Sequence, residues 1–333
     1  MPYKEKLKHP SVNPRKKQTY KITNWSEYNK SLKNRGNISL YFPEGDLKSQ
    51  FINEEPYMSG ISGRLCTYTP AYTELIYTFY KLFNWGMRQI TGYFEHLWKS
   101  LGLDIEVPSF GHLSDLFSQL PLKVKHFCHK LAKRLSSGES INLLLDSTGL
   151  RFCKASYWYE KKYGKTPKNE PWRKFSISID QEMEIFGAEI TDCDQADINL
   201  MNDLIPTESI NIKKVTADGA YYSIEGVETL YKRGITPVIQ PPPHSVVHGK
   251  PTTTWHDKIV QYIKDKGTVY AFHKKYGYGS RALVESQISR IKRSIGCSLK
   301  TQKIESQKRE GVIIANIINR WNSFGKCLAV KAH

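Results

Sequence analysis

The sequence contains no long hydrophobic run and comparatively few acidic side chains. None of its apolar stretches approaches the roughly 18 uninterrupted residues of a membrane-spanning helix. Acidic residues number 32 against 49 lysines and arginines, which gives the 333-residue chain a formal charge of +17. That surplus exceeds what solubility requires and indicates a polyanionic partner. Without a spanning segment, nucleic acid is a better candidate for this partner than an anionic membrane surface.

Paired cysteines and an apolar leader are also missing. The chain starts with closely spaced charged and polar residues and lacks the apolar core of an export signal, so we expect a cytoplasmic protein. The six cysteines are scattered, which indicates free thiols in a reducing compartment rather than a disulfide framework. His126 pairs with His129 and His244 with His248, but neither pair has a second pair at metal-site spacing. A zinc site is therefore not expected.

The first part of the chain, residues 1 to about 60, is rich in basic and polar residues and has few apolar residues in any period. Its densest charge run is Arg15, Lys16 and Lys17. This composition predicts a flexible basic arm. A solubilising tail is an equally good interpretation of the same residues.

Regular structure is expected from Thr69-Pro70, where a threonine cap precedes a proline at the first helical position. A second helix is expected from Met87 to about Gly102, and a shorter third one after Ser109. Three helices joined by tight turns predict an all-α, helix-turn-helix-like DNA-binding domain over residues 61–135. The segment after Ser109 is the candidate reading helix, although helical bundles without DNA function show the same pattern.

The pattern changes to alternating strands and helices after residue 136. An almost continuous apolar run from Ile141 to Leu145 predicts a central strand buried on both faces. Residues 175–180 alternate as in a half-buried strand, which is expected to form a meander with its neighbours. Further elements are expected as a strand at 184–190, a helix from about 196, a strand at 212–217, a helix at 224–232, a strand at 236–240 and, after a polar passage, helices at 280–296 and 306–322. The second domain, residues 136–333, is therefore α/β.

Three acidic residues stand at positions suited to chemistry. Asp146 ends the apolar run before Ser-Thr-Gly, so the strand is expected to emerge into a turn there, as functional groups of α/β sheets do. Asp218 ends another strand, and each aspartate alone is equally explained by turn formation. Glu285 lies on a helix, with Arg281 and Lys292 within about 40° of it. Such exposed Arg-Glu pairs are usually only solvated helix pairs.

Taken together, the two strand-end aspartates and the helical glutamate meet the needs of two-metal phosphoryl transfer. Two Mg²⁺ ions, for which Mn²⁺ can substitute, are held by hard oxygen ligands. Asp146, Asp218 and Glu285 are therefore the candidate catalytic residues and metal ligands. The nearby cations are expected to contact phosphates, which adds DNA-binding roles for Arg281 and Lys292.

Tyr278 completes this set of candidate site residues, because its side chain can hydrogen-bond a phosphate or stack on a displaced base. The run Tyr278-x2-Arg281-x3-Glu285-x6-Lys292 resembles the Tyr-Arg-Glu-Lys signature of bacterial insertion-sequence transposases with a DDE active site. Four specified residues at fixed spacing make this resemblance specific.

The similarity extends beyond the signature. It includes Leu-Asp-Ser-Thr around Asp146, Ala-Asp-Gly-Ala-Tyr around Asp218 and Val-Pro-Ser-Phe-Gly-His-Leu-Ser at 107–114, and it spans about residues 65–325. The resemblance implies an RNase H-like mixed sheet flanked by helices, preceded by the helical N-terminal domain. In such a fold, the central strand carries Asp146, a later strand carries Asp218 and a C-terminal helix carries Glu285.

The implied activity is cleavage of double-stranded DNA at the terminal inverted repeats of a mobile element, followed by attack of the freed 3′-hydroxyl on target DNA. Relatives of this kind act as homo-oligomers on DNA, in the bacterial cytoplasm at the nucleoid. Two other functions fit the sequence: a catalytically silent DNA-end-binding repressor derived from a transposase, and a metal-dependent nuclease of the same fold. The intact acid triad argues against the repressor, and the signature argues against a simple nuclease.

Overall fold

The computed structural model describes residues 19–54, 66–152, 164, 172–206 and 210–331. Its centre is a five-stranded sheet with the order β4-β3-β2-β5-β6. The first three strands of this order are antiparallel, and β5 and β6 continue the sheet in parallel, so the sheet is mixed. The strands are β2 (Ile141–Arg151), β3 (Trp172–Ile179), β4 (Ile185–Thr191), β5 (Ile212–Ala217) and β6 (Thr236–Ile239). The predicted α/β class and the meander of the first three strands are confirmed.

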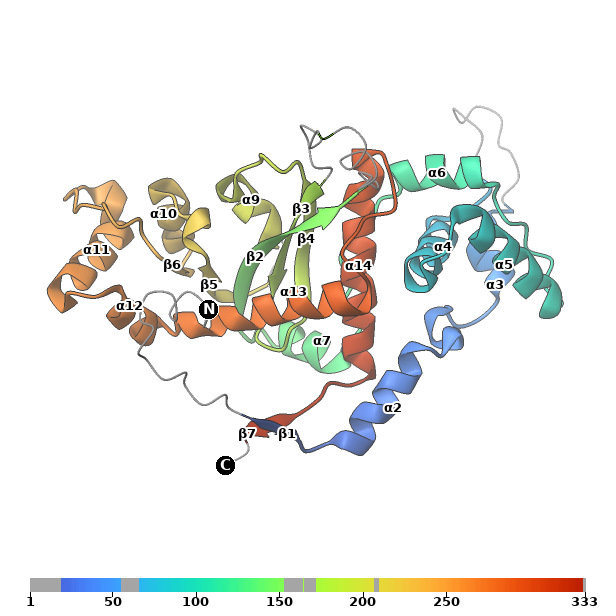
Figure 1. Ribbon diagram of the computed structural model, residues 1–333, viewed down its shortest axis with the longest axis horizontal. Coiled ribbons are helices and arrows are strands. Elements are labelled where there is room, and N and C mark those ends of the chain that lie inside the picture. Colours follow the sequence, from blue (N-terminus) through green and yellow to red (C-terminus); the bar gives the residue numbers. More distant parts are fainter. Residues whose placement is uncertain (1–18, 55–65, 153–163, 165–171, 207–209, 332–333) are drawn as a thin grey trace.

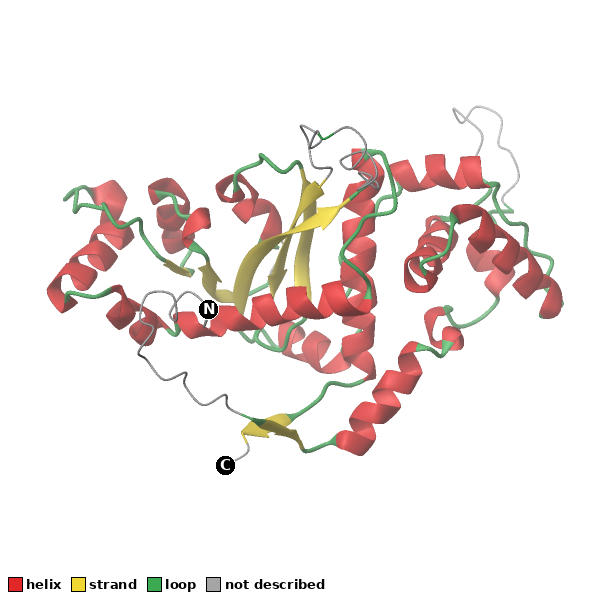
Figure 2. Ribbon diagram, in the orientation of Figure 1, coloured by secondary structure: helices red, strands yellow, loops and turns green. Residues whose placement is uncertain are grey.

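Helices lie on both faces of this sheet (Figure 2). Alternate residues of β2 explain why: Leu144 joins a hydrophobic cluster with one set of helices, whereas Leu143 and Leu145 join a second cluster on the other face. The central strand is thus buried on both sides, as its apolar run predicts. The first face is covered by α13 (Ala282–Ser294) and α14 (Ile304–Phe324), and the second by α7 (His129–Ser136), α9 (Asp197–Leu204) and α10 (Ile224–Lys232).

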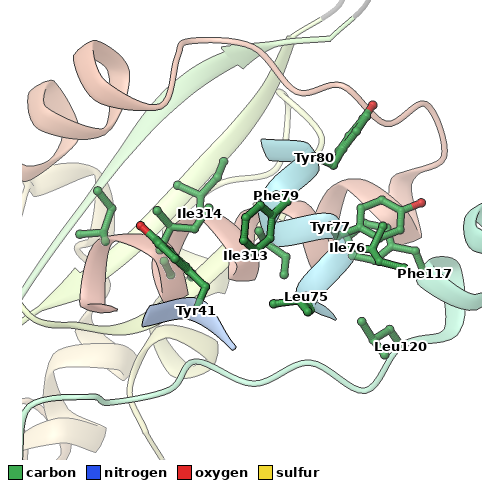
Figure 3. Close-up of a cluster of buried hydrophobic side chains, with 14 of the residues drawn as sticks. Tyr41, Leu75, Ile76, Tyr77, Phe79, Tyr80, Phe117, Leu120, Ile313 and Ile314 are labelled. Atoms are coloured by element: carbon green, nitrogen blue, oxygen red, sulfur yellow. The ribbon is translucent and has the colours of Figure 1, made fainter. Parts of the chain in front are cut away.

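Three further helices form the N-terminal helical region: α4 (Pro70–Phe83), α5 (Met87–Ser100) and α6 (Phe110–Gln119). Their predicted starts are confirmed, since the Thr69 side chain accepts a hydrogen bond from the amide of Tyr72. Side chains of α4 and α6 gather in one cluster with Ile313 and Ile314 of α14 (Figure 3). The helical region and one face of the sheet therefore share a continuous hydrophobic core.

Residues 20–52 differ from the flexible arm expected over 1–60. They form β1 (Tyr20–Ile22), α2 (Trp25–Arg35), the 3-10 helix η1 (Ile38–Tyr41) and α3 (Leu47–Phe51), and β1 pairs with β7 (Ala329–Lys331). Two aromatic anchors explain the order. Phe51 stacks on Tyr72 with ring centroids 4.8 Å apart, and the hydroxyl of Tyr41 accepts a hydrogen bond from Trp321 of α14 at 2.8 Å. Residues 1–18 and 55–60 of the expected arm lie outside the described residues.

The polar passage between β6 and α13 also contains regular structure. Two helices, α11 (Thr254–Lys266) and α12 (Val269–Tyr276), occupy it, together with the 3-10 turn η3 (Pro251–Thr253). The other 3-10 turns are η2 (Gly219–Tyr221), after β5, and η4 (Tyr278–Arg281), before α13. Figure 1 shows α11 and α12 beyond the β6 edge of the sheet, on the side opposite the N-terminal helical region. Among the described helices, none is long and apolar enough to cross a membrane.

A buried ion pair joins the helical region to α14. Lys81 of α4 lies 2.7 Å from Glu310 of α14, and their side chains are only 3% and 2% exposed. Glu310 also accepts hydrogen bonds from the amides of Lys300 and Thr301, and Lys81 donates to the carbonyl of Ser298. Both charged groups therefore have hydrogen bonds beyond the ion pair itself, which is the condition under which a buried charge is tolerated.

We predict that Lys81→Met lowers the free energy of unfolding by about 3–5 kcal/mol, because it leaves the Glu310 carboxylate buried without its counter-charge. Urea unfolding followed by circular dichroism measures this loss. The matched control is Lys48→Met, which breaks a solvent-exposed pair with Asp104. A loss for Lys81→Met no larger than that of the control would contradict the interpretation.

Candidate active site

Asp146 lies within β2 rather than at its end. The sequence predicts a turn directly after Asp146, but β2 continues to Arg151 because β3 pairs with it along this whole stretch. The parallel partner on the other side, β5, makes its last paired contact between Leu144 and Thr216. Asp146 therefore lies where β2 extends past β5 along β3, and this position leaves a small part of its side chain exposed.

Asp218 follows β5 directly and caps η2. It lies two residues beyond Thr216, as Asp146 lies two residues beyond Leu144, so the register of the parallel pair places the two aspartates side by side. One oxygen of each carboxylate bonds the next backbone amide: Asp146 Oδ1 accepts from Ser147 at 2.9 Å, and Asp218 Oδ1 accepts from Gly219 at 2.5 Å. The Oδ2 atoms remain for other partners.

Glu285 reaches the same place from α13. Gly277 ends α12 with a φ of 69°, a left-handed conformation that favours glycine, and the chain then turns through η4 into α13. Val284 and Ile291 are buried against the sheet, whereas Glu285, in the first turn of the helix, is exposed. The predicted division of this helix into an apolar and a polar face is confirmed.

Arg281 brings the three acids together. Its Nη1 atom lies 3.2 Å from Asp146 Oδ2 and 3.7 Å from Asp218 Oδ2, and its Nη2 atom donates a hydrogen bond to Glu285 Oε1. Carboxylates from β2, from the end of β5 and from α13 thus face one guanidinium group. The side chains of Asp218 and Glu285 are about half exposed, and that of Asp146 is mostly buried.

Electrostatics distinguish Asp146 from its neighbours. Burial raises the pKa of its carboxyl above the ordinary value, and repulsion by Asp218 and Glu285 acts in the same direction. The Ser147 amide and the Arg281 guanidinium oppose this shift without cancelling it. Ionising Asp146 therefore costs more free energy in the folded protein than in water, and a further cation beside the carboxylate would reduce this cost.

The remaining signature residues are Tyr278 in η4 and Lys292 in α13. Tyr278 stacks on the imidazole of His273, with ring centroids 4.3 Å apart and planes 11° from parallel, and burial raises the pKa of its hydroxyl. Lys292 lies on α13 two turns after Glu285, about 20° away around the helix, and is partly exposed. Arg281 contacts the acids and Tyr278 lies beside it in η4, whereas Lys292 lies further along α13 on the face that carries Glu285.

Sequence reasoning missed the residues that hold η4 in place. His273 Nε2 lies 3.1 Å from Gln240 Oε1, just after β6, and Lys214 of β5 donates to the carbonyl of Tyr276 at 3.1 Å. These contacts tie α12, and through it Tyr278, to the parallel edge of the sheet. No local signal marks them, because His273, Gln240 and Lys214 are distant in sequence and belong to no motif.

The donor atoms of the cluster suit a hard divalent cation. All three side chains are carboxylates, the ligand type that Mg²⁺ and Mn²⁺ prefer. Across the described parts of the chain, no group of three or more histidine, cysteine or acidic side chains is arranged around a single metal position. The oxygens of Asp146, Asp218 and Glu285 point instead to the Arg281 guanidinium, so the residues fit a metal by donor type while a protein cation holds them.

Comparison with known protein families shows which family the chain belongs to. Two families with the description Transposase DDE domain match the chain, one over residues 138–319 and the other over residues 33–155. The first match covers more than half of the chain. The chain belongs to the DDE transposase family. No solved structure matches it.

The DDE transposase match over residues 138–319 contains every predicted site residue, from Asp146 to Lys292. The mixed sheet, its flanking helices and the N-terminal helical region are consistent with the RNase H-like fold of a DDE domain. The second match reaches back to residue 33, so the DDE transposase family also covers part of α2 and the helices that follow. The fold class inferred from the sequence is confirmed.

We predict that Asp146→Asn stabilises the metal-free protein at neutral pH. The folded-state pKa of Asp146 lies above that of the unfolded chain, so the neutral carboxyl favours folding at acid pH and this contribution is lost as pH rises through the folded pKa. In EDTA, the melting temperature of wild type should therefore drop further below that of Asp146→Asn as pH increases. Asp194→Asn, at an exposed position, is the control. A difference that shrinks with rising pH would refute the assignment.

Proposed function

We propose that this chain is an insertion-sequence transposase of the Tyr-Arg-Glu-Lys type, which cuts and joins double-stranded DNA. The observation that carries the proposal is the convergence of Asp146, Asp218 and Glu285, from three separate elements, on one cationic group. Family membership supports the reaction class, and the charge of +17 supports a polyanionic substrate.

The roles of the acids follow from their positions. Asp146 and Asp218 lie side by side at the sheet, and Glu285 faces them from α13, so the three carboxylates can hold Mg²⁺ or Mn²⁺ between them. Two such ions, when bound, supply activation of the attacking oxygen and stabilisation of the leaving oxygen.

The reaction consists of two phosphoryl transfers at one site. In the first, water attacks a phosphodiester at the element end, the bond to the 3′-oxygen breaks, and a free 3′-hydroxyl results. In the second, this 3′-oxygen attacks a target phosphodiester, loses its proton and displaces the target's own 3′-oxygen. No bond to the protein forms. Tyr278, Arg281 and Lys292 contact the phosphates that flank the reacting bond.

The rest of the chain is assigned by the same proposal. The helical DNA-binding domain, residues 61–135, recognises the terminal inverted repeats with α6 as its candidate reading helix. The RNase H-like domain, residues 136–333, performs the chemistry, and basic residues of the N-terminal segment add phosphate contacts. We propose that the protein works as a homo-oligomer on two DNA ends, in the bacterial cytoplasm at the nucleoid.

The test is strand cleavage of DNA that carries the ends of the encoding element, with Mg²⁺ or Mn²⁺. We predict that Asp146→Asn, Asp218→Asn and Glu285→Gln each bind this DNA but cut it at least about 100-fold more slowly than wild type, since even outer-shell changes at metal sites reach that size. Asp265→Asn, which alters an exposed acid on α11, should cut normally. Cutting that survives any one triad substitution refutes the site.

The same experiment separates the other two functions. Wild type that binds the ends and leaves them intact would be a repressor, and wild type that cuts without joining the 3′-end to target DNA would be a nuclease. The transposase proposal requires both steps.

We further predict that Lys292→Gln weakens binding to all DNA sequences about equally and lowers the salt dependence of binding by about one counterion. Fluorescence anisotropy over a series of salt concentrations measures this slope. The control is Lys213→Gln, an exposed lysine at the start of β5, the opposite end of the strand from Asp218. Equal slopes for wild type and Lys292→Gln would show that Lys292 contacts no phosphate.

A further inference from the structure

Arg281 holds the oxygens that a metal ion requires. Asp146 Oδ1 and Asp218 Oδ1 accept hydrogen bonds from backbone amides, whereas Oδ2 of each aspartate and Oε1 of Glu285 face the Arg281 guanidinium. These are the three atoms bound by the guanidinium. A divalent cation and Arg281 therefore compete for the same ligands.

The charge balance of the cluster makes this competition strong. Three carboxylates carry three negative charges, and within the described residues each of their ion pairs is with Arg281. The guanidinium is itself mostly buried, with 21% of its side chain exposed. Attraction between charges increases as water is excluded, so Arg281 is held more firmly here than at an open surface.

A DNA phosphate offers Arg281 an alternative partner. The planar guanidinium binds phosphate through paired hydrogen bonds with good geometry, whereas its Nη1 atom is shared here between two carboxylates at 3.2 and 3.7 Å. Arg281 also ends η4, a turn that begins after the glycine at 277, so its long side chain can change direction while α13 stays in place.

We propose that Arg281 is the resident counter-cation of the acid triad in the DNA-free protein, and that DNA withdraws it, so that divalent metal binds tightly only after DNA. The inference rests on the proposed function, because it takes Asp146, Asp218 and Glu285 as metal ligands. It makes metal loading conditional on a bound substrate. By thermodynamic linkage, metal must strengthen DNA binding by the same factor as DNA strengthens metal binding.

The test is Mn²⁺ binding to the full-length chain without DNA, measured by the electron paramagnetic resonance signal of free Mn²⁺. Arg281→Gln should bind Mn²⁺ at least about 5-fold more tightly than wild type, the lower end of typical coupling between two sites. Wild type with a DNA duplex of the element end should gain affinity by a similar factor. Arg281→Gln should gain little from the same DNA.

The matched control is Lys292→Gln, which removes one positive charge from the same helix face without touching the acids. If both variants raise Mn²⁺ affinity equally, only net charge has changed and the counter-cation role is overturned. The double variant Arg281→Gln with Glu285→Gln separates failure of the counter-cation inference from failure of the proposed metal site. Loss of the tight Mn²⁺ binding in that variant supports the triad as ligands, whereas unchanged binding overturns the metal site of the proposed function as well.

Discussion

The fold depends on a row of buried polar side chains along α14. Asn319 accepts a hydrogen bond from the Ile185 amide and donates one to the Ile185 carbonyl, each at 2.8 Å, and Asn316 accepts from the Lys125 amide at 2.8 Å. A buried polar group left without its partner costs about 1–3 kcal/mol. Shifting α14 along its axis would break these bonds together. The helix therefore has one register against β4 and against the segment that leads out of the N-terminal helical region.

The same register of α14 also positions α13, which carries Glu285. Asn322, on the same row, accepts a hydrogen bond from Arg290 of α13 at 2.6 Å, and Gln287 of α13 donates to the Met183 carbonyl at 2.9 Å. Both bonds lie on the buried side of α13 and fix its rotation. These contacts involve neither Glu285 nor Asp146, yet they turn Glu285 toward the guanidinium that also faces Asp146. The proposed catalytic glutamate is only as well placed as the packing beneath its helix.

Local signals in the sequence predicted the elements that carry the site, and non-local contacts explain what they missed. The apolar run before Asp146 and the polar face of α13 depend on residues within a few positions of one another. The continuation of β2 past Asp146 depends on pairing with β3, and the order of residues 20–52 depends on Tyr41 and Phe51 reaching α4 and α14. The two strand ends and the signature predicted Asp146, Asp218 and Glu285 as one set, but they could not show that Arg281 contacts all three.

The arrangement of the acids explains why they attract cations at all. Each carboxylate is fixed by a different element: one by the pairing of β2, one by the cap of η2 and one by α13. Hydrogen bonds from the Ser147 and Gly219 amides hold the two aspartates, and Arg281 holds Glu285, so the three negative charges stay close together. Burial raises the pKa of the Asp146 carboxyl, and repulsion by Asp218 and Glu285 adds to this shift. Three carboxylates held close together attract positive charge. In the DNA-free protein this charge is the Arg281 guanidinium, and after DNA binds it is the divalent cation.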